Sequence, residues 1–330
     1  MATKVAKKRS AARKRPSAKP RSKRGASWKL RRAGGLQVLE SPALSRFNWL
    51  VHGFSTRPGG ASELKSVENR QNVGEKVLNL GFTEWDVRDR VLENRDKFFR
   101  SIGAGKMRIV ALRQIHSDLV HIVDSVNDAR MAVLSHEAAP QADALITREC
   151  GVLLVVQTAD CIPILLADTK RRAVAAIHSG WRGTVKRIAE KALGRMQMEF
   201  GTRPEDVIAA LGPGIGQSCY EVGTEVVAEF QAQFPNAREW FEGPFDSLAD
   251  SDNDPNWLPW LTMKPPGHAP PPPRVHLDLI AANRAILASA GIPAGKIFSS
   301  DYCTACRSDL FFSYRKERNT GRLMAAIGIR

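Results

Sequence analysis

Cysteine, long hydrophobic runs and aromatic residues are all scarce in this sequence of 330 residues, which has five cysteines and 7% aromatic side chains. An odd number of cysteines in a chain large enough to bury its own core predicts free thiols and an intracellular, cytoplasmic protein, and excludes a disulfide scaffold. The longest apolar stretches, at 152–156 and 161–167, are far shorter than the roughly 20 residues that cross a bilayer. We therefore expect no transmembrane helix.

Acidic residues are absent from the N-terminal segment, and this absence explains the net charge of +15. Residues 1–32 hold 14 of the 49 lysines and arginines, so the rest of the chain has 35 basic against 34 acidic residues. The segment has almost no large apolar side chain before Trp28 and cannot repay the entropy of folding. We predict a disordered basic arm over residues 1–34 with weak, non-specific affinity for nucleic acid or other polyanions. The segment lacks the apolar stretch that a secretory signal peptide needs. A transit peptide is the alternative interpretation.

The remaining residues, 35–330, alternate short apolar runs with turn signals and amphipathic stretches, which predicts one domain of mixed α and β structure. A stretch at about 241–274, rich in aspartate and proline, is expected to be a surface excursion. Buried strands are predicted at 108–112, 152–156, 173–177, 207–211 and 323–329, and helices at 84–100, 183–200 and 276–291.

Three potential metal ligands, His116, Cys161 and His178, each follow a separate apolar run. If these strands share a sheet and run in the same direction, the three side chains emerge on one rim. Two imidazoles and a thiolate suit Zn²⁺ when a fourth position is left open for water or substrate. Taken singly, each residue is more often an ordinary core or surface group.

Polar neighbours strengthen the hypothesis of a site. Asp160 precedes Cys161 and is a candidate for orienting a ligand or moving a proton, although a turn cap is the alternative. His178 opens the segment HSGWRGT, in which Arg182 and the start of a helix predict an anion site. A second arginine, Arg57, lies in a loop rich in glycine and serine, for which a solvated turn is the alternative.

The order of longer motifs resembles the laccase-domain family over about residues 36–330. Members of that family carry the names polyphenol oxidase, purine nucleoside phosphorylase and peptidoglycan editing factor. The matching motifs are HGFSTRPGGAS (52–62), QIHS (114–117), ADALIT (142–147), TADCIPILLAD (158–168), HSGWRGT (178–184), LGPGIGQSCYEVG (211–223), HLDL (276–279), CT (303–304) and FFSYRKERNTGRLMAAIGI (311–329).

The resemblance implies an α+β fold with a layered mixed sheet, like the catalytic domain of cytotoxic necrotizing factor. It also implies zinc held by His116, Cys161 and His178, phosphorolysis of purine nucleosides such as adenosine, inosine, guanosine or methylthioadenosine, and adenosine deamination as a second activity. Nucleosides and phosphate would then be the partners. By the same resemblance, Ser55 and Arg57 match a loop over the nucleoside site, and Gln114, Asp160 and Arg182 match positions that line the pocket. The expected substrate-binding residues are therefore Ser55, Arg57 and Arg182. The expected catalytic residues are Asp160, Arg57, Arg182 and Gln114.

Other functions stay open at this point. A copper polyphenol oxidase is disfavoured because multicopper centres need many histidines, commonly in His-x-His pairs, and the seven histidines here form none. An amidase acting on cell-wall precursors would use Cys161 as nucleophile and His178 as base, which leaves His116 superfluous. If the protein only bound nucleic acid through its basic arm, the histidines, the cysteine and the arginines named above would have no role. Cys303 and Cys306 form a lone CxxC pair, for which a packing role is preferred over redox or metal chemistry.

Overall fold

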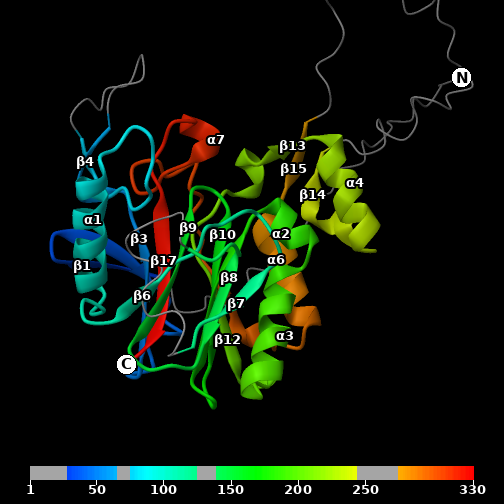
Figure 1. Cartoon of the computed structure of the whole chain (residues 1–330). Helices are drawn as coiled ribbons and strands as arrows, with labels where there is room; N and C mark the ends of the chain where they lie inside the picture. The colour runs from blue at the N-terminus through cyan, green and yellow to red at the C-terminus, as the bar shows by residue number, and fades with distance from the viewer. Residues whose placement is uncertain (1–27, 65–74, 125–138, 244–273) are drawn as a thin grey trace, which may run out of the picture.

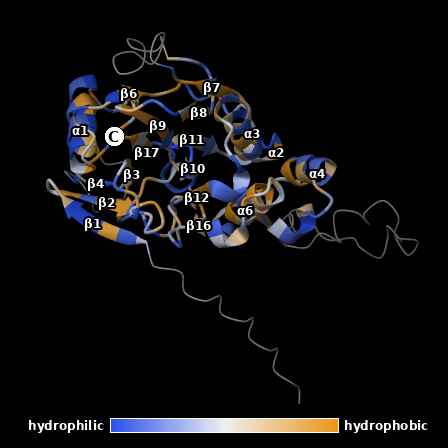
Figure 2. Cartoon of the chain, turned by 90° about the horizontal axis from the view of Figure 1, so that it is seen from below, coloured by the Kyte–Doolittle hydropathy of each residue, from blue (hydrophilic) through white to orange (hydrophobic). Residues whose placement is uncertain are grey.

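The computed structural model describes residues 28–64, 75–124, 139–243 and 274–330. Two six-stranded mixed sheets pack against each other, and α1 and α3 flank them on opposite sides (Figures 1 and 2). This is an α+β architecture with mixed sheets. No helix of the described residues is long and apolar enough to cross a membrane.

The first sheet gathers strands from both ends of the chain in the order β1-β2-β3-β17-β9-β6. All neighbouring pairs are antiparallel except β9 and β6. The C-terminal strand therefore lies in the middle of this sheet. The strand bounds are β1 Lys29–Ala33, β2 Leu36–Glu40, β3 Leu50–Ser55, β17 Leu323–Ile329, β9 Val152–Thr158 and β6 Arg108–Val110.

The second sheet has the order β16-β12-β10-β11-β8-β7, with parallel pairs at its two edges and antiparallel pairs between them. The chain passes from the first sheet to the second at residues 159–161, between β9 and β10. The bounds are β16 Ile297–Ser299, β12 Val207–Leu211, β10 Ile162–Asp168, β11 Ala173–Ser179, β8 Ala144–Thr147 and β7 Val120–Ile122.

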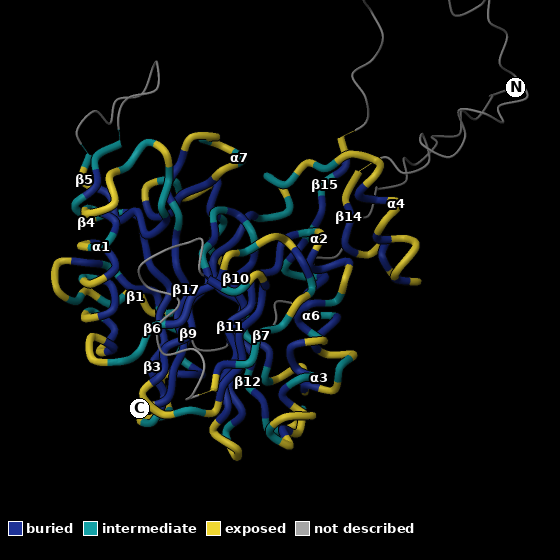
Figure 3. The backbone as a smooth tube through the Cα atoms, in the orientation of Figure 1, coloured by how far each residue is buried: buried dark blue, intermediate teal, exposed yellow. Residues whose placement is uncertain are grey.

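Strands β10 and β11 are buried along their whole length, as the dark blue centre of Figure 3 shows. Successive side chains of a strand point to opposite faces. Leu165 and Ala176 accordingly face the core between the sheets, whereas Ile164 and Ile177 face the core under α3 and α6. Burial on both faces is why these strands are continuous apolar runs.

Helices and short strands complete the layers. The helix α1 packs on β4 and β2, α3 packs on β11 and β8, and α6 contacts β16. A three-stranded sheet (β13-β15-β14) and a pair (β4-β5) lie outside the main sheets. The helices are α1 Arg88–Ser101, α2 Trp181–Val185, α3 Ile188–Phe200, α4 Thr224–Gln233, α6 Leu279–Ser289 and α7 Tyr314–Glu317, and the short strands are β4 Pro58–Glu63, β5 Lys76–Val77, β13 Glu221–Val222, β14 Phe241–Glu242 and β15 Val275–Leu277.

All five predicted strands are confirmed, and the three predicted helices differ in detail. The helix predicted at 84–100 is α1, which begins four residues later, at Arg88. The helix predicted at 183–200 is two helices, because Arg187 adopts a left-handed conformation (φ 60°) between α2 and α3. The apolar spacing hides this break, since Val185 and Ile188 are both buried on either side of it. The helix predicted at 276–291 begins only at Leu279, where Asp278 caps it by accepting a hydrogen bond from the amide of Ala281 (2.8 Å).

The described structure includes part of the segment that the composition assigns to the basic arm. Residues 29–33, placed in the predicted arm of residues 1–34, form β1 and pair with β2 over five residues. Trp28 packs against Phe54 with 5.2 Å between ring centroids. This aromatic contact helps to hold the start of β1 on the domain although the surrounding residues are basic. Residues 1–27 lie outside the described residues, as does the excursion predicted at 241–274 apart from its ends.

Candidate metal centre and cavity

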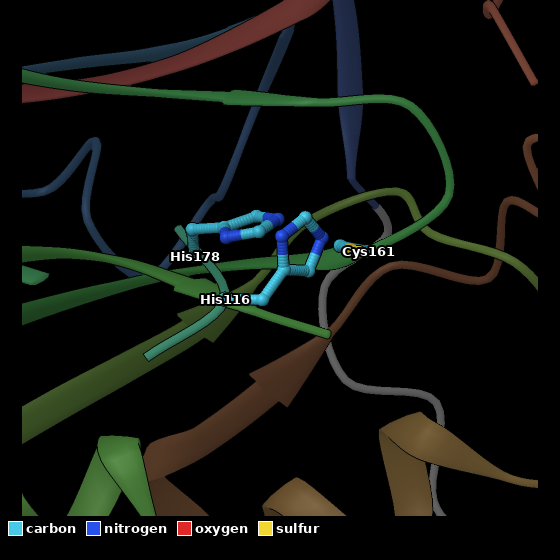
Figure 4. Close-up of side chains that lie close together, drawn as sticks. All are labelled: His116, Cys161 and His178. Atoms are coloured by element: carbon cyan, nitrogen blue, oxygen red, sulfur yellow. The ribbon is translucent and has the colours of Figure 1, made fainter. Parts of the chain in front are cut away.

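His116, Cys161 and His178 converge at the end of the two sheets, although they do not share one sheet (Figure 4). His116 follows β6 of the first sheet, Cys161 lies where the chain crosses from β9 to β10, and His178 is in β11 of the second sheet. Their ligand atoms all lie within 4.8 Å of one another, and the imidazole centroids are 4.9 Å apart with an interplanar angle of 81°. The predicted cluster is therefore present, but the single rim of parallel strands expected for it is wrong.

Asp143, just before β8, organises this cluster and was not singled out from the sequence. Its carboxylate accepts hydrogen bonds from the amides of Ile115 (3.2 Å), His116 (3.1 Å) and Ser117 (2.6 Å), and from the Ser117 hydroxyl (2.7 Å). It also accepts one from His178 Nδ1 at 2.8 Å. The buried Asp143 carboxylate thus holds the loop that carries His116. Because it also binds Nδ1 of His178, Nε2 of that imidazole stays available for a ligand.

These contacts shift the pKa values of three groups. Burial raises the pKa of Asp143, but the hydrogen bonds from His178 and Ser117 outweigh it and lower the pKa to about 2. Burial also raises the pKa of the Cys161 thiol, and the charges and hydrogen bonds of His178 and His116 lower it to about 6. Burial lowers the pKa of His178, whereas Cys161 and Asp143 raise it to about 9. Cys161 is therefore poised as a thiolate, the form of cysteine that binds metals.

The chain leaves room for this cluster at Gly180. A Cβ atom there would lie 2.8 Å from Cys161 Sγ and 3.3 Å from His116 Cδ2, so any larger residue would push into the ligands. Two imidazole nitrogens and a thiolate, with a carboxylate behind one imidazole, are a donor set that fits zinc with a fourth position open.

The cluster opens into a cavity of about 640 Å³. Its walls carry four arginines, three large aromatic rings and one carboxylate, which makes the cavity strongly cationic. The lining residues are Leu112, Gln114, His116, Gln157, Thr158, Ala159, Asp160, Cys161, His178, Gly180, Trp181, Arg182, Tyr220, Tyr314, Arg315, Arg318 and Arg322.

Gln114 and Arg182 lie in the cavity wall, as the resemblance implies. The Gln114 amide is occupied, however, because it donates to the backbone oxygen of Gln157 (2.8 Å) and accepts from its nitrogen (2.7 Å). Gln114 therefore fixes the loop before His116 to β9. The Arg182 guanidinium lies over the Trp181 ring at 4.4 Å. The helix that starts here, α2, has only five residues, so it is too short to supply the anion site expected at the start of a long helix. Of the groups expected to bind an anion, the Arg182 side chain is the one that lines the cavity.

Asp160 also lines the cavity, in a left-handed conformation (φ 93°) that is costly for a residue other than glycine. Thr304 Oγ1 donates to one of its carboxylate oxygens (2.6 Å), and the Arg315 amide donates to the other (2.7 Å). The side chain is thus held in place by two segments distant in sequence. Each oxygen retains a lone pair for a further hydrogen bond.

Ser55 and Arg57 are not among the residues that line the cavity, contrary to what the resemblance implies. Ser55 Oγ accepts a hydrogen bond from the Met324 amide (2.9 Å), inside the first sheet. Arg57 is buried and pairs with Glu317 at 2.7 Å and Glu75 at 3.5 Å. Its charge is neutralised by these carboxylates, so Arg57 anchors the end of α7 and is not presented to an anion.

Several cavity residues were missed in the sequence. Arg315, Arg318 and Arg322 all come from the segment FFSYRKERNTGR, whose motif was noted without a role for each arginine. The sequence signal that could have indicated them is the high number of arginines in this short segment between two apolar stretches. Tyr220 and Tyr314 complete the wall, with Arg315 lying over the Tyr220 ring at 5.0 Å.

Two relatives with curated names are similar to this chain over most of its length. A purine nucleoside phosphorylase of Deinococcus radiodurans is 35% identical over 302 residues, which cover 90% of this chain and 94% of that protein. A protein named adenosine deaminase RL5, from an unknown prokaryotic organism, is 34% identical over 282 residues, 84% of this chain and 93% of that protein.

Solved structures show the same fold. The protein YfiH of Bacillus licheniformis superposes with a TM-score of 0.72 at 29% identity, covering 90% of this chain and 97% of that one. YlmD of Geobacillus stearothermophilus gives 0.70 at 30% identity, covering 94% and 98%. The family described as multi-copper polyphenol oxidoreductase laccase matches residues 51–330. The chain belongs to this family, in which relatives are named purine nucleoside phosphorylases.

Proposed function

We propose that this protein is a zinc-dependent purine nucleoside phosphorylase that also deaminates adenosine. The observation that carries the proposal is the opening of the His116, Cys161 and His178 cluster into a cavity lined by arginines and aromatic rings. Phosphorolysis needs an anion site, a surface for a flat base and help for the departing base. The walls of one cavity offer all three.

Phosphate would bind to guanidinium groups that the protein does not neutralise itself. Within the described chain, Arg182 and Arg318 form no ion pair, and their guanidinium groups lie over Trp181 and Tyr314. Stacked guanidinium groups keep their fork of donors free for bidentate contact with phosphate oxygens. The purine would lie against the aromatic rings of the wall.

Zinc, when bound, would supply a Lewis acid that polarises a substrate atom and lowers the pKa of water toward neutrality. His116, Cys161 and His178 would hold it, with Asp143 fixing the tautomer of His178. Asp160 is the only carboxylate that lines the cavity in the described chain. Its free lone pairs make it the candidate acceptor for a substrate proton during deamination.

The test is product analysis of the purified, zinc-loaded protein. With adenosine or inosine, we expect free base and ribose 1-phosphate only when phosphate is present, and inosine from adenosine without it. Arg318→Ala should raise the phosphate concentration needed for half-maximal rate by roughly 10-fold or more, since a lost charged hydrogen bond costs about 1.5–3 kcal/mol. Arg46→Ala, at an exposed arginine outside the cavity, is the matched control. Base release that is independent of phosphate would contradict phosphorolysis.

A second candidate function rests on a different aspect of the same residues. The arrangement also matches that of cysteine hydrolases. Cys161 would be the nucleophile and contacts His178, the base, which in turn is oriented by the carboxylate of Asp143. The family resemblance, which implies a fold like the catalytic domain of cytotoxic necrotizing factor, and the family name peptidoglycan editing factor suggest the same chemistry. The substrate would then be an amide of a cell-wall precursor.

His116→Ala separates the two functions. A metal enzyme loses a ligand and therefore its zinc and its nucleoside turnover, whereas a cysteine amidase keeps its nucleophile and base. Retained cleavage of a muropeptide amide by His116→Ala, with no nucleoside turnover by the wild type, would favour the amidase.

A further inference from the structure

Three of the five cysteines meet at a place separate from the first cluster. Cys219 ends the short 3-10 helix Gln217–Cys219, and Cys303 and Cys306 lie in the turn after β16. The three sulfur atoms lie within 4.8 Å of one another, with 3.4 Å between those of Cys219 and Cys306. The CxxC pair is therefore completed by a third thiol from 84 residues earlier in the sequence.

Backbone amides converge on the sulfur of Cys303. The Gly216 amide donates to Cys303 Sγ at 3.1 Å, and together with the nearby amides of Ala305 and Cys306 it lowers the pKa of this thiol. Amide donors two and three residues after the first cysteine of a CxxC pair stabilise a negatively charged sulfur. Gly216 permits the approach, since a Cβ there would lie 3.3 Å from Cys303 Sγ and 3.2 Å from its Cβ.

We propose that Cys219, Cys303 and Cys306 form a second metal site, which takes a thiophilic divalent cation of the zinc class through three thiolates. In a tetrahedral site with Zn–S bonds of 2.3 Å, neighbouring sulfurs lie about 3.8 Å apart, so only small side-chain movements are needed. Cys306 is exposed, which gives a cation access and leaves the fourth position to water or a small exogenous ligand.

The second site lies directly behind the cavity wall. Thr304, between the two cysteines of the CxxC pair, donates to Asp160 Oδ1 at 2.6 Å and, through its amide, to the Gly214 oxygen at 2.9 Å. Tyr220, which lines the cavity, follows Cys219. A cation on the three thiolates would tie together the two segments that place Asp160 and Tyr220. It would act on the wall without touching the substrate.

Cobalt(II) is the probe, because it replaces zinc and its sulfur-to-metal absorption grows with the number of thiolates. The full-length reduced protein, stripped of metal with a chelator, is titrated with Co²⁺ under nitrogen. We expect two ions per chain, with the larger part of the sulfur absorption from the three-thiolate site. His116→Ala combined with His178→Ala should retain one ion and that larger part.

Cys306→Ser should lose the three-thiolate signal while keeping one ion at the first cluster. This side chain is exposed, so the variant is expected to fold with a circular dichroism spectrum like that of the wild type. Cys150→Ser, at an exposed cysteine outside both clusters, is the matched control and should keep both ions. In the wild type, Zn²⁺ should raise the melting temperature more than it does in Cys306→Ser.

Three results would overturn the proposal. The first is one Co²⁺ per chain in the reduced wild type, with no loss of sulfur absorption in Cys306→Ser. The second is a site that takes Cu⁺ but neither Co²⁺ nor Zn²⁺. The third is a Cys219–Cys306 disulfide, seen by mass spectrometry after reduction and air exposure, in a protein whose reduced form binds no second ion.

Discussion

Asp143→Asn is the substitution that tests the architecture of the metal centre most directly. The change keeps the size of the side chain but replaces one acceptor oxygen with a donor NH₂ group. If the NH₂ replaces Oδ2, it faces the amides of Ile115 and Ser117. If it replaces Oδ1, it faces the His116 amide and His178 Nδ1. Either orientation therefore sets one buried donor, the Ser117 amide or His178 Nδ1, and one part-buried amide against a third donor.

The size of the effect follows from these contacts. A buried donor left without an acceptor costs about 1–3 kcal/mol, so we expect the free energy of unfolding to fall by at least about 1–3 kcal/mol. In the second orientation, His178 can pair with the new NH₂ only by moving its proton to Nε2, the nitrogen needed by a metal. Loss of such an outer partner lowers metal affinity by roughly 10–100-fold.

The assays are urea unfolding of the metal-free protein and zinc competition with a chromophoric chelator. Asp118→Asn is the matched control, because Asp118 is near the same loop but pairs with Lys191 at the surface, where an ion pair contributes about 0–1 kcal/mol. Asp143→Asn with the stability and zinc affinity of the control would show that the carboxylate does not organise the site.

Three further predictions concern other parts of the molecule. Gly180→Ala places a Cβ 2.8 Å from Cys161 Sγ, so zinc content measured by elemental analysis should fall well below one per chain, and full occupancy would refute the tight fit. Burial lowers the pKa of His52 from 6.5 to about 4. As the pH falls from about 6.5 to 4, this side chain is therefore protonated in the unfolded state but not in the folded state. The free energy of unfolding should drop by up to about 3 kcal/mol over that range. His52→Gln should show a flatter profile in urea unfolding, and identical profiles would contradict this assignment. Deleting residues 1–27 should abolish salt-sensitive retention on heparin without changing the melting temperature, whereas deleting 1–34 also removes β1 and should lower it; equal melting temperatures for both would mean that β1 contributes nothing.

The strands and the metal-ligand types could be predicted from the sequence because both depend on local information. A strand buried on both faces is apolar along most of its length, as β9 is over residues 152–156 and β11 over residues 173–177. Residue type alone likewise restricts the ligands, since only a few side chains bind zinc. Short-range signals failed where one residue decides the backbone, as at Arg187 between α2 and α3.

The tertiary structure decided which charged and sulfur side chains act together. Arg57 and Arg318 are both arginines near small residues in sequence, yet Arg57 is neutralised by Glu317, 260 residues away, while Arg318 lines the cavity. Cys219 joins Cys303 and Cys306 only because β16 pairs with β12, which brings the two segments to one edge of the second sheet. The sequence determines the chemistry that each side chain can perform. Which partner neutralises, orients or completes it depends on strand pairing between residues far apart in the chain, because hydrogen bonds and ion pairs act over only a few ångströms.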